Sequence, residues 1–144
     1  MLQVTGDIWS LDFEARCVTT NGVVLPSGDL VMGKGIAQQA KKRYPGIEAI
    51  LGSWVKAHGN WPHYIKEFGV ISYPTKWHWR DPSDPILVTR GAERLVEIAD
   101  SNGLKSIGLP RPGCGLGRLC WFSVCEHIKD ILDDRFTVVS QEAE

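Results

Sequence analysis

The chain has 144 residues, of which 43% are hydrophobic and 23% are charged, and its net charge at pH 7 is −1. This composition is close to that of an average globular protein, which argues against a disordered chain, a collagen or a coiled coil. The length fits one domain spanning residues 1–144, large enough to fold without a disulfide or a structural metal. A net charge of −1 excludes a globally basic nucleic-acid coat, but it allows a local basic pocket.

No stretch of the sequence predicts a membrane segment or a metal site. Apolar runs stay well short of the ~20 residues of a membrane span, and Met1-Leu2-Gln3 does not begin a signal peptide, so we expect a cytoplasmic protein without a membrane partner. Cys114, Cys120, Cys125 and His127 could suggest zinc, but structural zinc sites usually pair their ligands at gaps of about two to four residues. We therefore predict reduced thiols, no metal and no cofactor.

Hydrophobic periodicity predicts strands that alternate with helices along the chain. The first helix is opened by Gly33-Lys34-Gly35 and ended by Pro45, and the third is opened by Asp84-Pro85 and closed by Asn102-Gly103. The strands are predicted over residues 2–5, 15–20, 64–73, 104–109 and 136–139, and the remaining helices over residues 47–58 and 121–132. Strands joined by crossover helices predict an α/β fold with a largely parallel or mixed sheet.

Two of the predicted helices have a clear apolar face. These faces consist of Ile47, Ile50, Leu51, Trp54 and Val55 in one helix, and of Trp121, Val124, Cys125, Ile128 and Leu132 in the other. We expect both faces to be buried. By contrast, Lys41-Lys42-Arg43 lies at the C-terminal end of the first helix, where cations are favourable, and we interpret it as a solvated end.

Two glycine-rich stretches, residues 31–36 and 111–117, follow predicted strands. Ligands of α/β folds bind at the carboxyl ends of the strands, so both stretches fall where a site is expected. Glycine lets backbone N–H groups approach an anion, and a helix N-terminus adds partial positive charge. Neither stretch is a standard nucleotide motif, and each alone could be a simple turn. Together they indicate an anion site that grips a diphosphate from two sides.

Residues 72–80, with the sequence SYPTKWHWR, combine a lysine, a histidine and an arginine with two tryptophans after a predicted strand. Trp77 and Trp79 could stack on a base, and the cations could meet phosphate. Lys76 could act as an amine nucleophile if burial among the tryptophans and nearby cations lowers its pKa. The alternative is that a tryptophan covers the core while Lys76 and Arg80 are solvated.

The chain resembles the macrodomains, the α/β family that binds ADP-ribose. The resemblance rests on four segments in the family's order: Gly6-Asp7-Ile8 after the first strand, Thr20-Asn21 with residues 31–37, the lysine segment 73–80, and the loop 109–117. It spans nearly the whole chain and implies a three-layer sandwich, with a central mixed sheet flanked by helices. It also implies ADP-ribose as the ligand, with ADP-ribosylated DNA or protein as the partner.

The resemblance also implies a role for individual residues. Asp7 reads the adenine amino group, and Lys76 engages the anomeric carbon of the distal ribose as the catalytic residue. The ligand-binding residues are Asp7, Ile8, Thr20, Asn21, Met32, Gly33, Lys34, Gly35, Ile36, Pro112, Gly113, Cys114, Gly115, Leu116 and Gly117. Next to Lys76, His78, Trp79 and Arg80 offer a donor, a stacking face and a cation that contact the substrate.

Within the family, the segments are similar to the lysine-dependent branch of ADP-ribosyl glycohydrolases. The members that act on protein also use an aspartate in the second loop, and this chain has Gly117 at that position. The members that act on DNA resemble this chain there, so we expect removal of single ADP-ribose groups from DNA bases, with acidic protein side chains as a second substrate. A non-catalytic ADP-ribose reader and an ADP-ribose phosphate phosphatase remain as alternatives. The insert at residues 23–29 lengthens the first loop.

Overall fold

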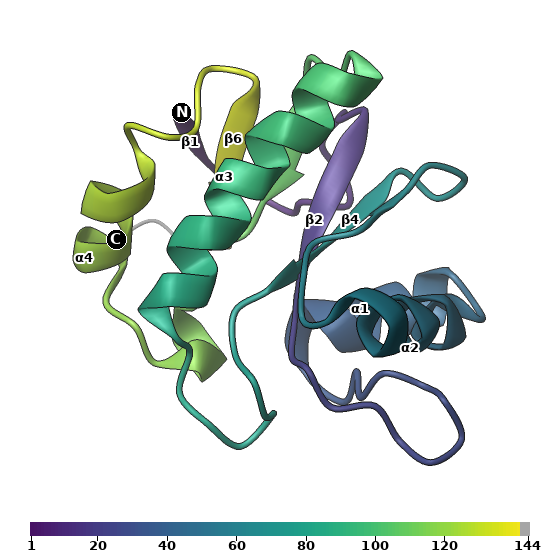
Figure 1. Ribbon diagram of the computed structural model, residues 1–144. Helices are drawn as coiled ribbons and strands as arrows, with labels where there is room; N and C mark the ends of the chain where they lie inside the picture. The colour runs from purple at the N-terminus through teal and green to yellow at the C-terminus, as the bar shows by residue number, and fades with distance from the viewer. Residues whose placement is uncertain (142–144) are drawn as a thin grey trace.

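The backbone of residues 1–141, which the computed structural model describes, alternates strands with helices as predicted (Figure 1). The strands are β1 (Leu2–Thr5), β2 (Ala15–Thr20), β3 (Tyr64–Ile65), β4 (Val70–Pro74), β5 (Ile107–Leu109) and β6 (Phe136–Ser140). The α-helices are α1 (Gly35–Arg43), α2 (Ile47–His58), α3 (Pro85–Asn102) and α4 (Trp121–Ile128), and a 3-10 turn, η1, spans Gly115–Gly117. Within this described part, no helix is long and apolar enough to cross a membrane.

Across residues 1–141, the strands form one sheet in the order β1-β6-β5-β2-β4-β3. The β1–β6, β6–β5, β5–β2 and β2–β4 pairs are parallel, whereas β3 runs antiparallel to β4. The predicted mixed sheet is therefore confirmed. Because β1, β2, β4, β5 and β6 point the same way, the segments that follow them all leave the same edge of the sheet, here called the carboxyl edge.

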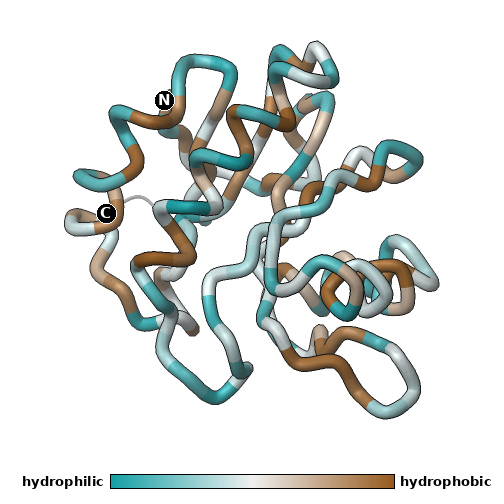
Figure 2. The backbone as a smooth tube through the Cα atoms, viewed as in Figure 1, coloured by the Kyte–Doolittle hydropathy of each residue, from teal (hydrophilic) through white to brown (hydrophobic). Residues whose placement is uncertain are grey.

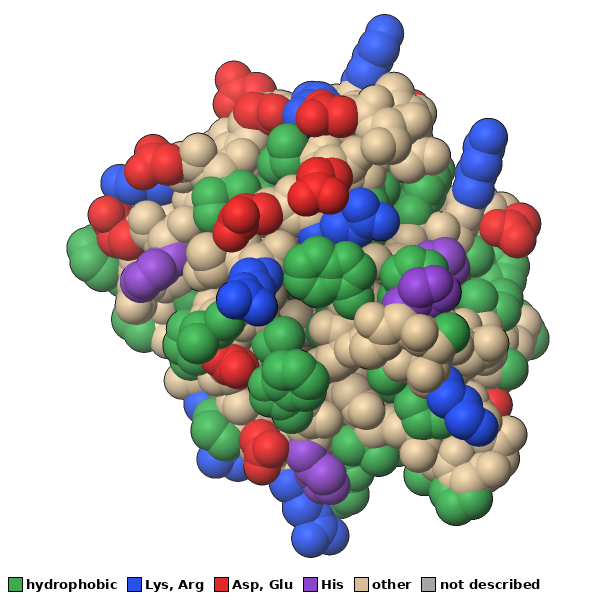
Figure 3. Space-filling view, viewed as in Figure 1, with side chains coloured by type: hydrophobic (Ala, Val, Ile, Leu, Met, Phe, Trp, Pro, Cys, Tyr) green, Lys and Arg blue, Asp and Glu red, His purple; other side chains and the backbone are tan. Residues whose placement is uncertain are grey.

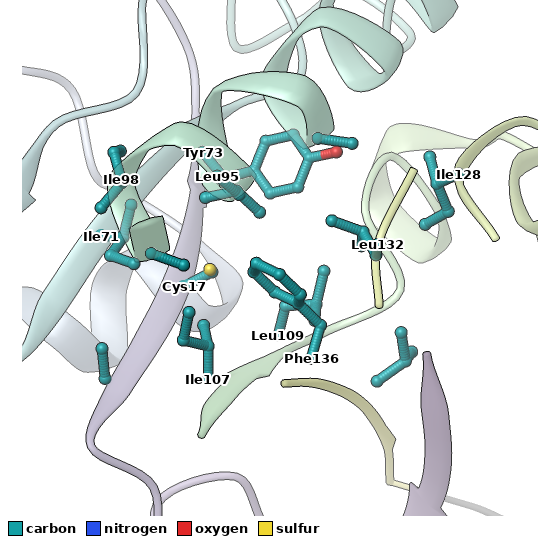
Figure 4. Close-up of a cluster of buried hydrophobic side chains, with 14 of the residues drawn as sticks. Cys17, Ile71, Tyr73, Leu95, Ile98, Ile107, Leu109, Ile128, Leu132 and Phe136 are labelled. Atoms are coloured by element: carbon teal, nitrogen blue, oxygen red, sulfur yellow. The ribbon is translucent and has the colours of Figure 1, made fainter. Parts of the chain in front are cut away.

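Alternate residues of β2 and β4 point to opposite faces of the sheet and build two cores. Cys17 and Tyr73 pack under α3 and α4, where Figure 4 shows them beside Leu95 and Phe136. Val18, on the other face of β2, packs against α1 and α2. A sheet covered by helices on both faces is the three-layer sandwich that the family resemblance implies.

Helix α3 has the boundaries that the sequence predicts. The Asp84 side chain accepts a hydrogen bond from the Ile86 N–H at 2.9 Å, Pro85 occupies the first turn, and Gly103 ends the helix in the left-handed region at φ 62°. Hydrophobic and hydrophilic residues alternate along α3 in Figure 2, as expected for a helix with one buried face. This helix fixes the C-terminal end of the segment that carries Lys76.

A substitution at Gly91 should destabilise this helix and sheet interface. A Cβ at Gly91 would overlap the ring of Tyr73, which is fully buried and donates a hydrogen bond to the Val88 carbonyl at 2.5 Å. The ring has no room to move, so Gly91→Ala is expected to lower the free energy of unfolding by about 1–3 kcal/mol. Urea denaturation measures the change, with Ser101→Ala, an exposed position of α3, as the control. An unchanged midpoint would contradict the tight packing.

Some predicted boundaries are wrong. Residues 64–73 form two antiparallel strands rather than one, because Gly69 adopts φ 63° and donates to the Lys66 carbonyl in a tight turn. Phe68 leaves the strand and stacks on Tyr44 instead. Ile50, expected on a buried face, is exposed. In addition, β5 begins at Ile107, β4 and β6 each extend one residue further than predicted, and α4 ends at Ile128, although Leu132 beyond it is buried.

Candidate functional site

The segments that carry the predicted site residues meet at the carboxyl edge. They are residues 6–8 after β1, 21–34 after β2, 75–84 after β4 and 110–117 after β5. In Figure 1 the connections from β2 to α1 and from β4 to α3 extend from the same side of the molecule. A hollow of about 860 Å³ lined by Met1 and residues 129–135 lies at the opposite edge, where β1 and β6 begin, and it contains none of the predicted residues.

The first glycine-rich loop ends at the N-terminus of α1. Met32 is buried beneath it, and Gly35 begins the helix in the left-handed region at φ 61°, which favours glycine. The first turn of α1 carries no acidic side chain, so its free N–H groups are available to an anion. A Cβ on Gly35 would lie 3.5 Å from Leu116 of the second loop. The two glycine-rich loops therefore approach one another across the edge.

Thr20 ends β2, Asn21 follows it directly, and both residues are buried. The Asn21 amide donates to the Val31 carbonyl at 2.9 Å, and its oxygen accepts from the Val23 N–H at 2.8 Å. These two bonds hold the ends of the insert at residues 23–29 together. Asn21 thus braces the start of the glycine-rich loop, a structural role that the sequence did not reveal.

The second loop places several backbone groups in unusual conformations. Gly113 and Gly115 have φ values of 79° and 62°, and Arg118 has φ 66°, which is uncommon for a residue other than glycine. Gly115 faces open space and Leu116 is 62% exposed, whereas Pro112, Gly113 and Gly117 are buried. Cys114 donates weakly to the Pro112 carbonyl at 3.8 Å. The exposed turn at Gly115 leaves room for an anion above it.

Lys76 follows β4 and is held through its backbone. The Thr75 N–H donates to the Thr20 carbonyl at 3.0 Å, and the Asn60 amide donates to the Lys76 carbonyl at 3.0 Å. The Gly22 N–H donates to the Trp77 carbonyl at 3.1 Å, so the lysine segment lies against the end of β2. The Lys76 amine itself makes a long contact of 3.4 Å to the Trp79 carbonyl.

The surroundings of Lys76 lower the pKa of its amine. Burial is the main cause that lowers the pKa of its amine, the cation of Arg118 adds to the effect, and Asp81 opposes it. The direction matches the sequence prediction, and Arg118, the cation that adds to the effect, follows the second loop directly. A lowered pKa enlarges the fraction of neutral amine, the form that can attack an electrophilic carbon.

The tryptophans beside Lys76 stay exposed and do not cover the core. Trp77 is 58% exposed and donates from its indole to the Asp84 carboxylate at 3.1 Å. Trp79 is 44% exposed, with the His78 ring stacked at 5.1 Å and the Arg80 guanidinium 4.6 Å from its ring centre. Figure 3 shows large hydrophobic side chains exposed beside Lys or Arg side chains on this face of the molecule. The segment thus presents flat aromatic surface next to positive charge.

Asp7 is exposed at the end of β1 and is held as a carboxylate. Its oxygens accept from the Trp9 N–H and the Ser10 hydroxyl, both at 3.0 Å. These bonds, with the cations of Arg43 and Arg16, lower the pKa of Asp7. Lys41, Lys42 and Arg43 are exposed in the last turn of α1, as predicted, and Arg43 in addition stacks on Trp9 at 4.5 Å. Ile8 next to Asp7 is buried.

Known proteins are similar to this chain in sequence and in fold. The DNA ADP-ribosyl glycohydrolase of Mycobacterium tuberculosis is 32% identical over 135 residues, which cover 86% of this chain. The human ADP-ribose glycohydrolase OARD1 is 27% identical over 135 residues, 90% of this chain and 82% of that protein. The solved macrodomain of Mycobacterium tuberculosis DarG has a TM-score of 0.82 at 28% identity, covering 99% of this chain and 97% of that one. The chain belongs to the macrodomain family.

The alignments cover nearly all of this macrodomain, but they cover less than half of the length of some relatives. The chain spans 36% of the length of the mycobacterial DNA ADP-ribosyl glycohydrolase. The Thermosipho africanus DarTG in complex with ADP-ribose has the same fold, with a TM-score of 0.77 at 23% identity over 96% of this chain and 41% of that one. No protein-family model matches the sequence. The family predicted from the four segments is confirmed.

Three residues of this macrodomain site were missed by the sequence analysis: Asn60, Ser83 and Arg118. Asn60 holds the Lys76 carbonyl, Ser83 packs under Gly117, and Arg118 brings a cation close to Lys76. Only the position of Ser83 immediately before the Asp84-Pro85 helix start could have drawn attention to it. Within residues 1–141, no cluster of three His, Cys, Asp or Glu side chains could hold a metal ion.

Proposed function

We propose that this macrodomain binds ADP-ribose at the carboxyl edge and removes it from modified DNA bases by cleaving the glycosidic bond. The observation that carries the proposal is the Lys76 amine, with a lowered pKa, on the same edge as two facing glycine-rich loops. The mycobacterial relative is named a DNA ADP-ribosyl glycohydrolase, and the human relative is named an ADP-ribose glycohydrolase. Both names agree with cleavage of an ADP-ribose linkage.

The ligand would lie along the edge with its diphosphate between the two loops. Backbone N–H groups of residues 33–36 and 113–117 would bind the phosphate oxygens, because the loops meet near Gly35 and Leu116. The adenine would be read by Asp7 and packed near Ile8. The distal ribose would then face Thr20, Asn21 and Lys76, the residues beside the end of β2 and β4.

The proposed chemistry uses the neutral Lys76 amine as a nucleophile. The amine forms a C–N bond to the anomeric carbon while the glycosidic bond breaks, and the bonding electron pair leaves with the base, which takes up a proton. Water then adds to the same carbon, the amine leaves, and ADP-ribose is released. Burial and the Arg118 cation support this role, since both favour the neutral form of the amine.

Exposed side chains next to Lys76 support a DNA base as the leaving group. A base bound through a glycosidic bond leaves less readily than a carboxylate and gains from being held and polarised. Trp79 offers a stacking face, while His78 and Arg80 flank it with a ring nitrogen and a cation. We propose ADP-ribosylated DNA as the principal substrate and acidic protein side chains as the second.

A reader that binds ADP-ribose without cleaving it is the second candidate. It is favoured by Gly117, since the second loop has no carboxylate there to activate water. Turnover separates the two functions, because a reader binds ADP-ribose and releases none from a modified substrate. The experiment is incubation of the protein with an ADP-ribosylated oligonucleotide, followed by chromatography of the released ADP-ribose.

Removing the carboxylate of Asp7 should weaken ADP-ribose binding. A charge-assisted hydrogen bond to the adenine amino group would be lost, so Asp7→Ala is expected to raise the Kd for ADP-ribose about tenfold or more. Calorimetry measures the Kd. The Ser10→Ala variant keeps the carboxylate and loses only one bond to it, so it controls for disturbance of the turn. Equal affinities of wild type and Asp7→Ala would show that Asp7 does not read the adenine.

A further inference from the structure

Ser83 is a buried hydroxyl for which neither the fold nor the proposed chemistry gives a use. Its side chain lies between β4 and α3, is 5% exposed, and its Oγ has no hydrogen-bond partner among the described residues. Buried polar groups in proteins are nearly always hydrogen-bonded, so an unpartnered one beside a site calls for an explanation. The contacts of Ser83 with the second glycine-rich loop and with the lysine segment indicate its role.

Ser83 packs directly beneath the second glycine-rich loop. Its N–H donates to the Gly117 carbonyl at 2.9 Å, and a Cβ on Gly117 would overlap the Ser83 Oγ. A Cβ on Gly113 would lie 3.2 Å from the Ser83 Cβ. The serine therefore touches the loop at two glycines, and its side chain as it lies here leaves no space for a Cβ at residue 117.

The other side of Ser83 is tied to the lysine segment. The N–H of the next residue, Asp84, donates to the Thr75 carbonyl at 2.7 Å and closes the loop of residues 75–84 that carries Lys76. Arg118, immediately after Gly117, is close enough to Lys76 to lower the pKa of its amine. The contact between Ser83 and Gly117 thus lies between the element that presents the amine and the loop that would hold phosphate.

We propose that Ser83 is a positioning residue, which sets the second glycine-rich loop at a fixed distance from Lys76 and requires glycine at residue 117. This inference rests on the proposed function, because it concerns the same site. Ser83 acts through the loop and through Lys76 rather than by contact with the reacting atoms. Its effect should therefore be larger on turnover than on overall stability.

The test is a double-mutant cycle on the Ser83 and Gly117 contact. The variants are Ser83→Gly, Gly117→Ala, and the pair Ser83→Gly/Gly117→Ala, in which the whole serine side chain is removed as the methyl group is added. Each is measured for kcat and KM on an ADP-ribosylated oligonucleotide, for the Kd of free ADP-ribose by calorimetry, and for Tm. Ser53→Ala, an exposed serine of α2, is the matched control.

Gly117→Ala alone is expected to lower kcat about tenfold or more, because its methyl group displaces the loop from Ser83. In the Ser83→Gly background the same substitution should lower kcat less than about threefold, since the overlapping serine side chain is gone. Ser83→Ala, which removes only the hydroxyl, should lower kcat more than it raises KM, and Ser83→Thr should restore part of the loss.

If Gly117→Ala lowered kcat by the same factor in the wild-type and the Ser83→Gly backgrounds, the proposal would be overturned. Wild-type kcat and KM for Ser83→Ala would also overturn it. If the decrease in kcat across the variants simply matched the decrease in Tm, the role of Ser83 would be purely structural and the proposal would be overturned. If the wild type released no ADP-ribose, the proposed function would fail. The Kd values of the same variants would then still decide whether Ser83 positions the loop.

Discussion

Replacing Lys76 by alanine is expected to reduce the release of ADP-ribose from DNA by ~100-fold or more, the loss typical of removing a chemical participant. The Kd for free ADP-ribose should stay near that of the wild type, because the two glycine-rich loops and Asp7 remain in place. Single-turnover kinetics and calorimetry measure the two quantities. A lysine that contributed only charge would give the opposite pattern, with weaker binding and unchanged turnover.

Two further variants separate nucleophilic from electrostatic roles of Lys76. Lys76→Arg keeps the positive charge but provides no neutral amine, so it should be nearly as inactive as Lys76→Ala. Arg118→Gln removes the cation that helps to lower the pKa of Lys76, so the rise of the rate with pH should shift to higher pH. The direction follows because a higher pKa requires a higher pH to give the same fraction of neutral amine. Full activity of Lys76→Arg would reject the nucleophilic mechanism.

A glutamate at Gly115 should abolish ADP-ribose binding and leave the protein folded. A Cβ there meets no atom within 4 Å, so the side chain would extend into the space above the loop, where we propose that the diphosphate binds. Its carboxylate would repel the phosphates. Calorimetry should show no binding, and circular dichroism should show an unchanged fold.

The control for this substitution is Gly115→Ala. Gly115 has φ 62°, so any other residue there carries a backbone cost of about 1–2 kcal/mol, which alanine and glutamate share. Alanine should therefore retain measurable binding, and the difference between the two variants reports the charge and bulk of the glutamate. Normal binding by Gly115→Glu would show that the second loop is only a turn.

Local sequence signals predicted most of the helices, strands and loops of this macrodomain. The Asp84-Pro85 start and the Gly103 end of α3 are determined by capping chemistry within a few residues, so they were read correctly. The glycine-rich loops follow parallel strands, and parallel strands bring such loops to one edge. The predicted strand over residues 64–73 failed because the apolar pattern continues through Gly69, whose positive φ reverses the chain.

What the sequence did not reveal depends on contacts between distant segments. Ser83 gains its importance from Gly117, which packs on it only in the folded chain. Arg118 influences Lys76 across two loops, so the nearby Arg80 was the more obvious cation in the sequence. Arg43 is exposed at the end of α1, as predicted, but its stacking on Trp9 beside Asp7 joins segments that are distant in the sequence. Spacing along the chain contains no information about such pairs.

We propose that the macrodomain removes ADP-ribose from DNA with the Lys76 amine. The most direct measurement offers the wild-type protein an ADP-ribosylated single-stranded oligonucleotide and, in parallel, a peptide carrying ADP-ribose on an acidic side chain. Released ADP-ribose is followed by chromatography. We expect release from the oligonucleotide, and some release from the peptide. Release from the peptide alone would contradict the DNA assignment, and binding of ADP-ribose without release from either substrate would contradict catalysis.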